Sequence, residues 1–183
     1  MVGRTWGLMG SSDPGCRTNS HREGLTLELD EAKEGFKIIL DNAKMLIEDS
    51  DVLASRGRYT SFPLGILALE EIGKAILLAQ TIQKSNGKVR INWWGDHRKK
   101  LRNALTFNSE IPSNLLDHII NTLEKAKVEG LYVDWKDGVW LYPQDEGMAW
   151  YVSLRSTKDA REIINGAKYL LQNVKETFKD NIK

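Results

Sequence analysis

Cysteine is almost absent from this sequence, and histidine is scarce. The 183 residues include one cysteine, Cys16, and three histidines that lie far apart along the chain. A lone cysteine cannot form an intramolecular disulfide, which is typical of a protein from the reducing cytoplasm. No H-x-x-x-H, E-x-x-H or C-x-x-C pair occurs. We therefore expect no metal centre.

The common signatures of cofactor and nucleotide sites are also missing. Neither G-x-x-x-x-G-K-[ST] nor G-x-G-x-x-G occurs in the sequence, so a P-loop or a dinucleotide-binding fold is not supported. No Ser/His/Asp arrangement can be assembled from the positions of the three histidines. We expect a protein that works without a cofactor.

A long apolar run free of charge is lacking as well. The best membrane-spanning candidate is "FPLGILALEEIGKAILLAQTI", residues 62–82, but Glu70, Glu71 and Lys74 lie at its centre. Each ionised group costs roughly 2.5–3.5 kcal/mol on the insertion scale, whereas each apolar residue returns only about 0.3–0.6 kcal/mol. The segment should not insert, so we expect a soluble protein with no membrane partner.

These three charges need an explanation within an otherwise apolar helix. Glu70 and Lys74 are spaced i, i+4, so they could form an ion pair along a narrow solvent-facing stripe. Alternatively, the charges form a polar seam against another helix or subunit, because an unpaired, half-buried charge is costly. The candidate partners in that case are Arg56, Arg58, His97 and Lys100.

The net charge is only +1, but the charge is unevenly distributed along the chain. Glu28–Asp51 holds eight acidic and three basic residues, whereas Lys84–Arg102 holds seven basic residues and one acidic residue. Within the second window, "RINWWGDHRKKLR" (90–102) combines five basic residues with two tryptophans and His97. Cations contact phosphates and aromatic rings stack on unpaired bases, so the composition suits single-stranded RNA. The alternative is a solvated helix face whose tryptophans fill a helix corner.

Apolar residues recur at intervals of three and four over five stretches. They predict helices over about 29–56, 61–84, 95–107, from Pro112 to Lys127, and 158–180. The predicted inner stripes are Leu115, Ile119, Leu123 and Ala126 on the fourth helix, and Ile163, Ala167, Leu170, Leu171, Val174 and Phe178 on the last.

The stretch between the last two predicted helices has no helical period, and it contains aromatics, Gly and Pro. It predicts an ordered loop with a short hairpin around Asp137-Gly138. Residues 1–24 are rich in Gly and Ser and indicate a disordered extension, a cloning remnant or a misassigned start. The fold prediction is an all-α antiparallel bundle of four to five helices over residues 25–183, with a long ordered loop before the last helix.

Three stretches together resemble one family. "SRGRYTSFPLGILALEEIGKAILL" (55–78), "DHRKKL" (96–101) and "KVEGLYVDW" (127–135) look like blocks of the AbiV family of abortive phage infection proteins, which belong to the HEPN superfamily. The resemblance covers about residues 29–180. It implies an all-α HEPN-like bundle, a homodimer, and a role in defence against phage with a phage protein as the trigger.

The resemblance also implies a chemistry. Many HEPN domains are metal-independent RNases with an Arg, four to six residues and then a His at a dimer cleft, and Arg90 and His97 fit that spacing. It implies that His97 acts as acid or base, while Arg90 and Lys100 neutralise the phosphate. Further implied RNA-contacting residues are Arg98 and Arg58, and the supporting polar seam is Glu70, Glu71 and Lys74.

A second interpretation remains open. The intervening "INWWGD" lacks the polar residue that usually follows the arginine of the HEPN motif. On this interpretation the protein is a non-catalytic HEPN-like binding module. It senses a phage component or inhibits translation through protein or RNA contacts.

Overall fold

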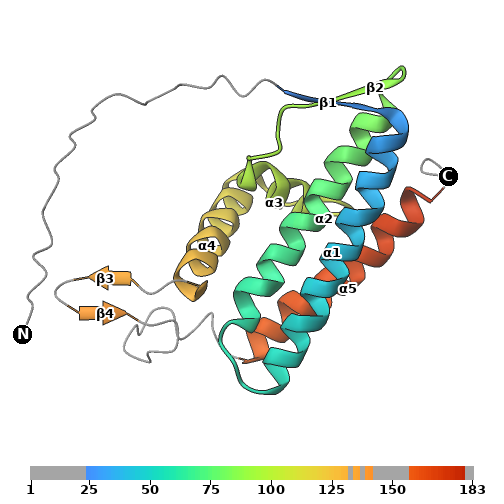
Figure 1. Ribbon diagram of the computed structural model, residues 1–183. Coiled ribbons are helices and arrows are strands. Elements are labelled where there is room, and N and C mark those ends of the chain that lie inside the picture. The colour runs from blue at the N-terminus through green and yellow to red at the C-terminus, as the bar shows by residue number, and fades with distance from the viewer. Residues whose placement is uncertain (1–23, 132–133, 137–138, 142–156, 180–183) are drawn as a thin grey trace, which may run out of the picture.

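The computed structural model describes residues 24–131, 134–136, 139–141 and 157–179. Five helices dominate this part of the chain (Figure 1), which confirms the predicted all-α class. They are α1 (Leu29–Ser55), α2 (Ser61–Gln83), α3 (His97–Thr106), α4 (Ser113–Leu131) and α5 (Thr157–Thr177). Their ends lie close to the predicted ones, apart from a fourth helix that continues to Leu131. Most of the predicted loop before the last helix, and the 1–23 segment, lie outside the described residues.

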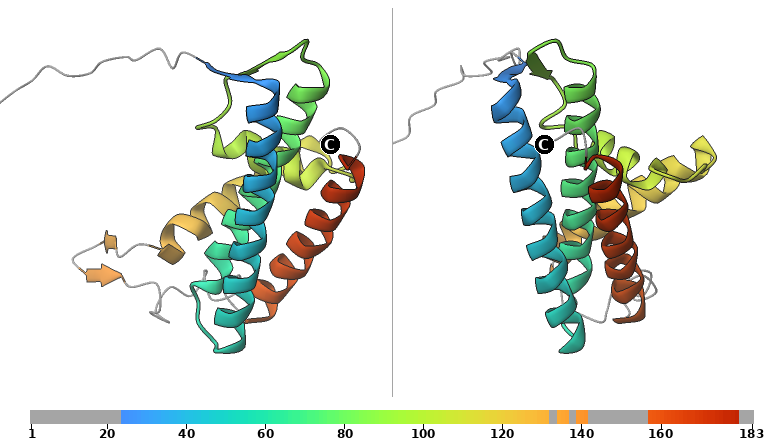
Figure 2. Two further views of the ribbon diagram at one scale, coloured as in Figure 1. Left: turned by 45° about the vertical axis from the view of Figure 1, so that its right-hand side comes forward. Right: turned by 90° about the vertical axis from the view of Figure 1, so that its right-hand side faces the viewer.

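Helix α2 is the centre of the bundle. It packs against α1, α3, α4 and α5, which explains why its sequence is apolar on nearly every side. In the left-hand view of Figure 2, α4 and α5 lie on opposite sides of the α1–α2 pair. The largest fully buried side chains include Ile66, Ile72 and Ile76 of α2. A polar side chain on α2 therefore faces another helix more readily than it faces water.

The α1–α2 connection shows how the sequence ends one helix and starts the next. Gly57 has a φ of +67°, a left-handed conformation that glycine adopts without steric cost. The amide of Arg58 then donates to the carbonyl of Leu53 at 2.9 Å. The predicted stop at Gly57 is thus confirmed, and α2 starts at Ser61 as expected.

A small two-stranded sheet was not predicted. Strand β1 (Leu25–Glu28) pairs antiparallel with β2 (Lys88–Ile91), with Thr26 opposite Arg90. The sheet lies at the end of the bundle where α1 begins and α2 ends (Figure 1). Val89 and Ile91 are buried while Lys88 and Arg90 are exposed. The alternation was missed because four residues are too few to show a period of two.

The hairpin expected around Asp137-Gly138 is confirmed by pairing on both sides of it. Strand β3 (Asp134–Lys136) pairs antiparallel with β4 (Val139–Leu141). The two turn residues themselves lie outside the described residues.

Two details of the predicted inner stripes are wrong. On α4, Leu115 is 49% exposed and Ile119 is only partly buried, whereas their neighbours Leu116 and Ile120 are buried. On α5, Ile163 is only partly buried, while its neighbour Ile164 is fully buried. Both errors are shifts by one residue, because adjacent apolar pairs such as Leu115-Leu116 fit a helical stripe equally well from sequence.

Candidate active site

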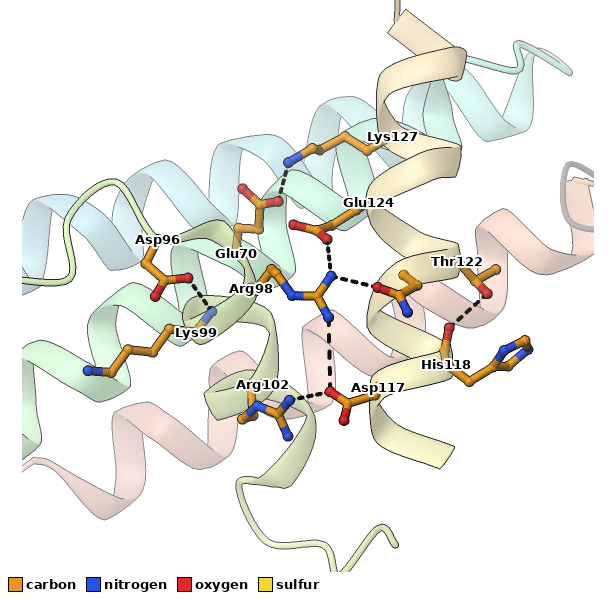
Figure 3. Close-up of polar contacts among 11 residues, drawn as sticks. Glu70, Asp96, Arg98, Lys99, Arg102, Asp117, His118, Thr122, Glu124 and Lys127 are labelled. Carbon is orange, nitrogen blue, oxygen red and sulfur yellow. Dashed lines mark hydrogen bonds and ion pairs between the residues drawn. The ribbon is translucent and has the colours of Figure 1, made fainter. Parts of the chain in front are cut away.

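Glu70 is a buried carboxylate at the middle of α2, with 4% of its side chain exposed. Its Oε2 lies 2.8 Å from Nδ1 of His97, the first residue of α3. Its Oε1 accepts a hydrogen bond from Nζ of Lys127 on α4 (Figure 3). Each carboxylate oxygen thus has a partner from a different helix. The charge within α2 belongs to a polar seam between helices, and Glu70 does not pair with Lys74 along its own helix.

Lys74 pairs instead with Glu71. Its Nζ lies 2.5 Å from Oε1 of Glu71, and only 13% and 18% of the two side chains are exposed. The same ammonium lies 5.0 Å from the ring centroid of Trp94, within the range of a cation–π contact. Trp94 comes just before α3, so this contact also joins α2 to the α3 region.

Gly73 explains how α3 comes so close to these charges. A Cβ added at Gly73 would lie 1.9 Å from the carbonyl oxygen of Lys100, far inside van der Waals contact. The backbone of α3 therefore lies directly on the backbone of α2. The pattern E-E-x-G-K therefore acts as one unit. Its glycine lets α3 approach α2 closely, and its charged residues Glu70 and Lys74 contact side chains at and just before the start of α3.

The start of α3 places His97 at the edge of this seam. The Asp96 carboxylate accepts a hydrogen bond from the Lys99 amide at 2.9 Å, an N-terminal cap that begins the helix at His97. The side chain of His97 is 56% exposed although its Nδ1 is held by Glu70. One nitrogen is thus held in the protein while the ring remains accessible to a ligand.

Lys100 lies on the buried side of α3, with 5% of the residue exposed. Burial lowers the pKa of its ammonium, the charge of Lys74 lowers it further, and Glu70 and Glu71 oppose the shift. Among the described residues none forms an ion pair or hydrogen bond with this ammonium. The site therefore holds a buried positive charge without a direct counter-charge, which an anionic ligand would stabilise.

The geometry determines which tautomer of His97 fits. An ionised carboxylate only accepts hydrogen bonds, so Nδ1 must donate to Glu70. In the neutral ring Nε2 then carries the lone pair and can accept a proton. A carboxylate–imidazole pair of this kind can act as a general base with its orientation fixed.

Other basic residues of α3 are held by α4. Arg98 donates to Glu124 at 2.7 Å and to Asn121 at 2.6 Å, and Arg102 pairs with Asp117. Figure 3 shows both arginines reaching from α3 to the acidic side chains of α4. The implied RNA-contacting residue Arg98 thus has its charge balanced within the fold.

Arg90 and Arg58 lie apart from this cluster. Arg90 projects from β2 into a separate hollow that Lys99 also lines and His97 does not. Arg58 is an exposed residue of the α1–α2 turn, and the nine residue steps from Ser61 to Glu70 rise about 13.5 Å along α2. Among the described residues, no ion pair or hydrogen bond joins His97 to either arginine, and Arg90 and His97 do not line the same hollow.

A family model described as AbiV, of the HEPN type, matches residues 31–147, more than half of the chain. This chain belongs to the AbiV family. Membership makes it an abortive-infection protein of the HEPN type. The matched region includes all the residues of the cluster around Glu70. No curated protein matches the chain, and no solved structure matches it.

The candidate site groups five of the predicted site residues and adds three that were not among them. The predicted members are Glu70, Glu71, Lys74, His97 and Lys100. The additions are Gly73, Trp94 and Lys127. Lys127 is the first residue of the "KVEGLYVDW" block, which carries part of the family resemblance. Nothing in the sequence shows that this lysine contacts Glu70.

Two negative findings apply to the described part of this AbiV protein. There, no group of three or more His, Cys, Asp or Glu side chains is arranged to hold a metal ion. None of the described helices combines the length and the apolar character needed to cross a membrane.

Proposed function

We propose that this AbiV-family protein is a metal-independent endoribonuclease that cleaves RNA by transesterification. The single observation that carries the proposal is the 2.8 Å contact between Glu70 and the half-exposed His97. It supports a base that is oriented inside the protein and open to substrate. The uncompensated ammonium of Lys100 beside it suits a phosphate.

In the proposed reaction, Nε2 of His97 removes the proton from a ribose 2′-hydroxyl. The 2′-oxygen attacks the adjacent phosphorus, the bond from phosphorus to the 5′-oxygen breaks, and the leaving oxygen takes up a proton. The products are a 2′,3′-cyclic phosphate and a 5′-hydroxyl. Lys100 stabilises the negative charge on the phosphate, while Glu70 positions the base. The leaving 5′-oxygen takes this proton from water, and His97 afterwards releases its own proton to water.

The proposal includes a homodimer. Ile38, Met45 and Val52 form a stripe on the outer side of α1, each at least 50% exposed. Their spacing of seven residues is typical of a seam between paired helices. The exposed Lys44–Glu48 pair beside Met45 could exchange partners with a second copy. We propose a second copy of this chain as the occupant, in the cytoplasm and with a phage protein as the trigger.

The test compares cleavage of a labelled RNA by the wild type and by His97→Ala. Removing a general base should lower the rate by about 10²–10⁴-fold and leave the melting temperature almost unchanged, since the side chain is half exposed. His118→Ala is the matched control, because His118 is exposed on α4. Mass spectrometry should identify the cyclic phosphate, and a chelator should not reduce the rate. Equal cleavage by His97→Ala, or none by the wild type even under induced toxicity, would contradict the proposal.

A second candidate function is a non-catalytic binding module. The separation of Arg90 from His97 within the chain favours it, as does the way Glu70 joins α2, α3 and α4. On this view the seam is structural. It predicts that Glu70→Ala disrupts folding or dimerisation at least as severely as His97→Ala disrupts function, so a well-folded, dimeric Glu70→Ala variant would argue against it.

A further inference from the structure

A hollow of about 400 Å³ lies between the C-terminal half of α2, strand β2 and α3. Three cations line it, Lys84, Arg90 and Lys99, and no carboxylate from the described part of the chain does. They come from three different elements, so the tertiary structure gathers them. The hollow is separate from the cluster around Glu70, because the two share no residue.

These three cations differ from the other basic residues nearby. Lys88 pairs with Glu28, Arg98 with Glu124 and Arg102 with Asp117. In contrast, no side chain within the described ranges pairs with the charged ends of the cations in the hollow. The basic window thus contains cations that are paired with acidic side chains, the buried Lys100 at the active site, and the three unpaired cations of the hollow. Like charges gathered without a counter-charge favour an anion.

The rest of the lining suits more than a bare phosphate. Trp93 forms one wall and is 5% exposed, so it is a rigid apolar surface. The amide side chains of Gln80, Asn92 and Asn103 also line the hollow. Amides can donate to and accept from base edges. Cations, amides and an aromatic wall are the groups that bind the phosphate, the edge and the face of a nucleotide.

The hollow borders the proposed active site through two tryptophans. Trp93 stacks on Trp94, with ring centroids 6.0 Å apart and an angle of 30° between the planes. Trp94 in turn lies over Lys74 of the active-site cluster. On α3, His97 and Lys99 are two residues apart, which turns their side chains about 200° away from each other. The start of α3 thus faces the active site on one side and the hollow on the other.

We propose that this hollow binds one nucleotide of a single-stranded RNA through its phosphate, beside the nucleotide presented to His97. Lys84, Arg90 and Lys99 hold the phosphate, and the exposed Trp94 stacks on a base between the two sites. The inference rests on the proposed function for its choice of RNA, but binding in the hollow requires no cleavage. The inference thus assigns Arg90 to binding the phosphate of the neighbouring nucleotide. It does not assign Arg90 to neutralising the phosphate that reacts.

The experiment measures binding of a short fluorescein-labelled RNA whose riboses carry 2′-O-methyl groups, which removes the nucleophile. Fluorescence anisotropy is recorded for the wild type and for the triple variant Lys84→Gln, Arg90→Gln and Lys99→Gln at several salt concentrations. We expect the triple variant to bind at least tenfold more weakly. The slope of log affinity against log salt should fall by about 0.7, the value for the loss of one neutralised phosphate on a single strand.

The matched control is Lys88→Gln, which removes one positive charge from the same strand outside the hollow. It should bind within twofold of the wild type, and circular dichroism should show equal folding of all variants. The inference would be overturned if the triple variant bound the RNA within twofold of the wild-type affinity. It would also be overturned if Lys88→Gln lost as much affinity as the triple variant, or if the wild type did not bind the RNA. In a competition arm, free AMP should displace the strand only weakly. Displacement at the affinity of the strand itself would overturn the assignment to RNA in favour of a free nucleotide.

Failure of this inference is distinguishable from failure of the proposed function. His97→Ala should bind the 2′-O-methyl strand like the wild type and cleave no unmodified RNA. Undiminished cleavage with an unchanged KM in the triple variant would overturn the role of the hollow and leave the nuclease intact. If RNA binding depended on the residues of the hollow but neither the wild type nor any variant cleaved RNA, the binding role of the hollow would be supported. The proposed nuclease activity would be overturned.

Discussion

The carbonyl oxygen of Lys100 packs against the backbone of Gly73, so closely that a Cβ on the glycine would lie 1.9 Å from it. This contact sets the distance between α2 and α3. It is also what allows Glu70 on α2 to reach Nδ1 of His97 at 2.8 Å. A backbone contact without polar chemistry of its own thereby positions the polar groups of the site.

Gly73→Ala should separate the two helices and disrupt the site. The clash is with backbone, which cannot rotate away, so we expect a loss of about 3 kcal/mol in the free energy of unfolding and a melting temperature lower by roughly 6–12 °C. Cleavage should fall with it. Gly166→Ala on α5 is the control, since nothing lies within 4 Å of its added Cβ and the helix gains up to about 1 kcal/mol. Equal thermal melts of Gly73→Ala and wild type would contradict the close packing.

Glu70→Gln should reduce both stability and cleavage. The neutral amide leaves Lys127, whose side chain is only 12% exposed, without its ion pair, at a cost of roughly 3–5 kcal/mol. The amide also permits the other tautomer of His97, so the rate should fall at least tenfold. Urea denaturation and an RNA-cleavage assay measure the two effects. Glu71→Gln removes the same charge one residue away and should leave the rate within threefold of the wild type; a larger loss there than in Glu70→Gln would refute the assignment.

Lys100→Met should change how stability depends on pH. Because burial lowers the pKa of Lys100 below its usual 10.5, the unfolded chain binds this proton more tightly than the folded one. Between the two pKa values stability therefore rises with pH, and below them the cost of the buried charge is constant. We expect Lys100→Met to be more stable than the wild type at pH 7, with an advantage that shrinks as the pH approaches 10.5. Urea denaturation at pH 7, 8, 9 and 10 tests this, and a difference that does not vary with pH would be the contrary result.

Trp94→Ala should weaken RNA binding without unfolding the protein. The ring is 46% exposed, and stacking of a base on an aromatic ring contributes about 1–3 kcal/mol, so affinity should fall roughly 5–150-fold. Trp94→Phe keeps a stacking surface and should recover most of the binding in the anisotropy assay. Full affinity in Trp94→Ala would exclude a stacking role.

Met45→Glu should prevent dimer formation. It places a charge at the centre of the exposed stripe on α1, where a second copy would have to desolvate it. Light scattering should then give the mass of one chain in place of two. Tyr169→Glu, at a residue of α5 that is 71% exposed, should leave the mass unchanged. A wild type that is monomeric at all concentrations would rule out this interface.

Much of the fold could be predicted from local sequence patterns. Helical periods and the glycine stop at Gly57 act over a few residues, so the helices lie close to where they were expected. The apolar character of α2 on all sides indicated its central position. Where two adjacent residues both fit a stripe, as at Leu115 and Leu116, only packing could decide which one is buried.

By itself, the sequence determined the helices, the charge within α2 and, through three short blocks, the family. Only the tertiary structure decided the partners of those charges, because ion pairs form between residues that are distant along the chain, as Glu70 and Lys127 are. It also divided one basic stretch into Arg98, balanced by α4, and Arg90 and Lys99, which share a hollow with Lys84. Local periodicity sets which face of a helix is polar, and the packing of that face against other helices sets which charges are balanced and which remain available to a ligand.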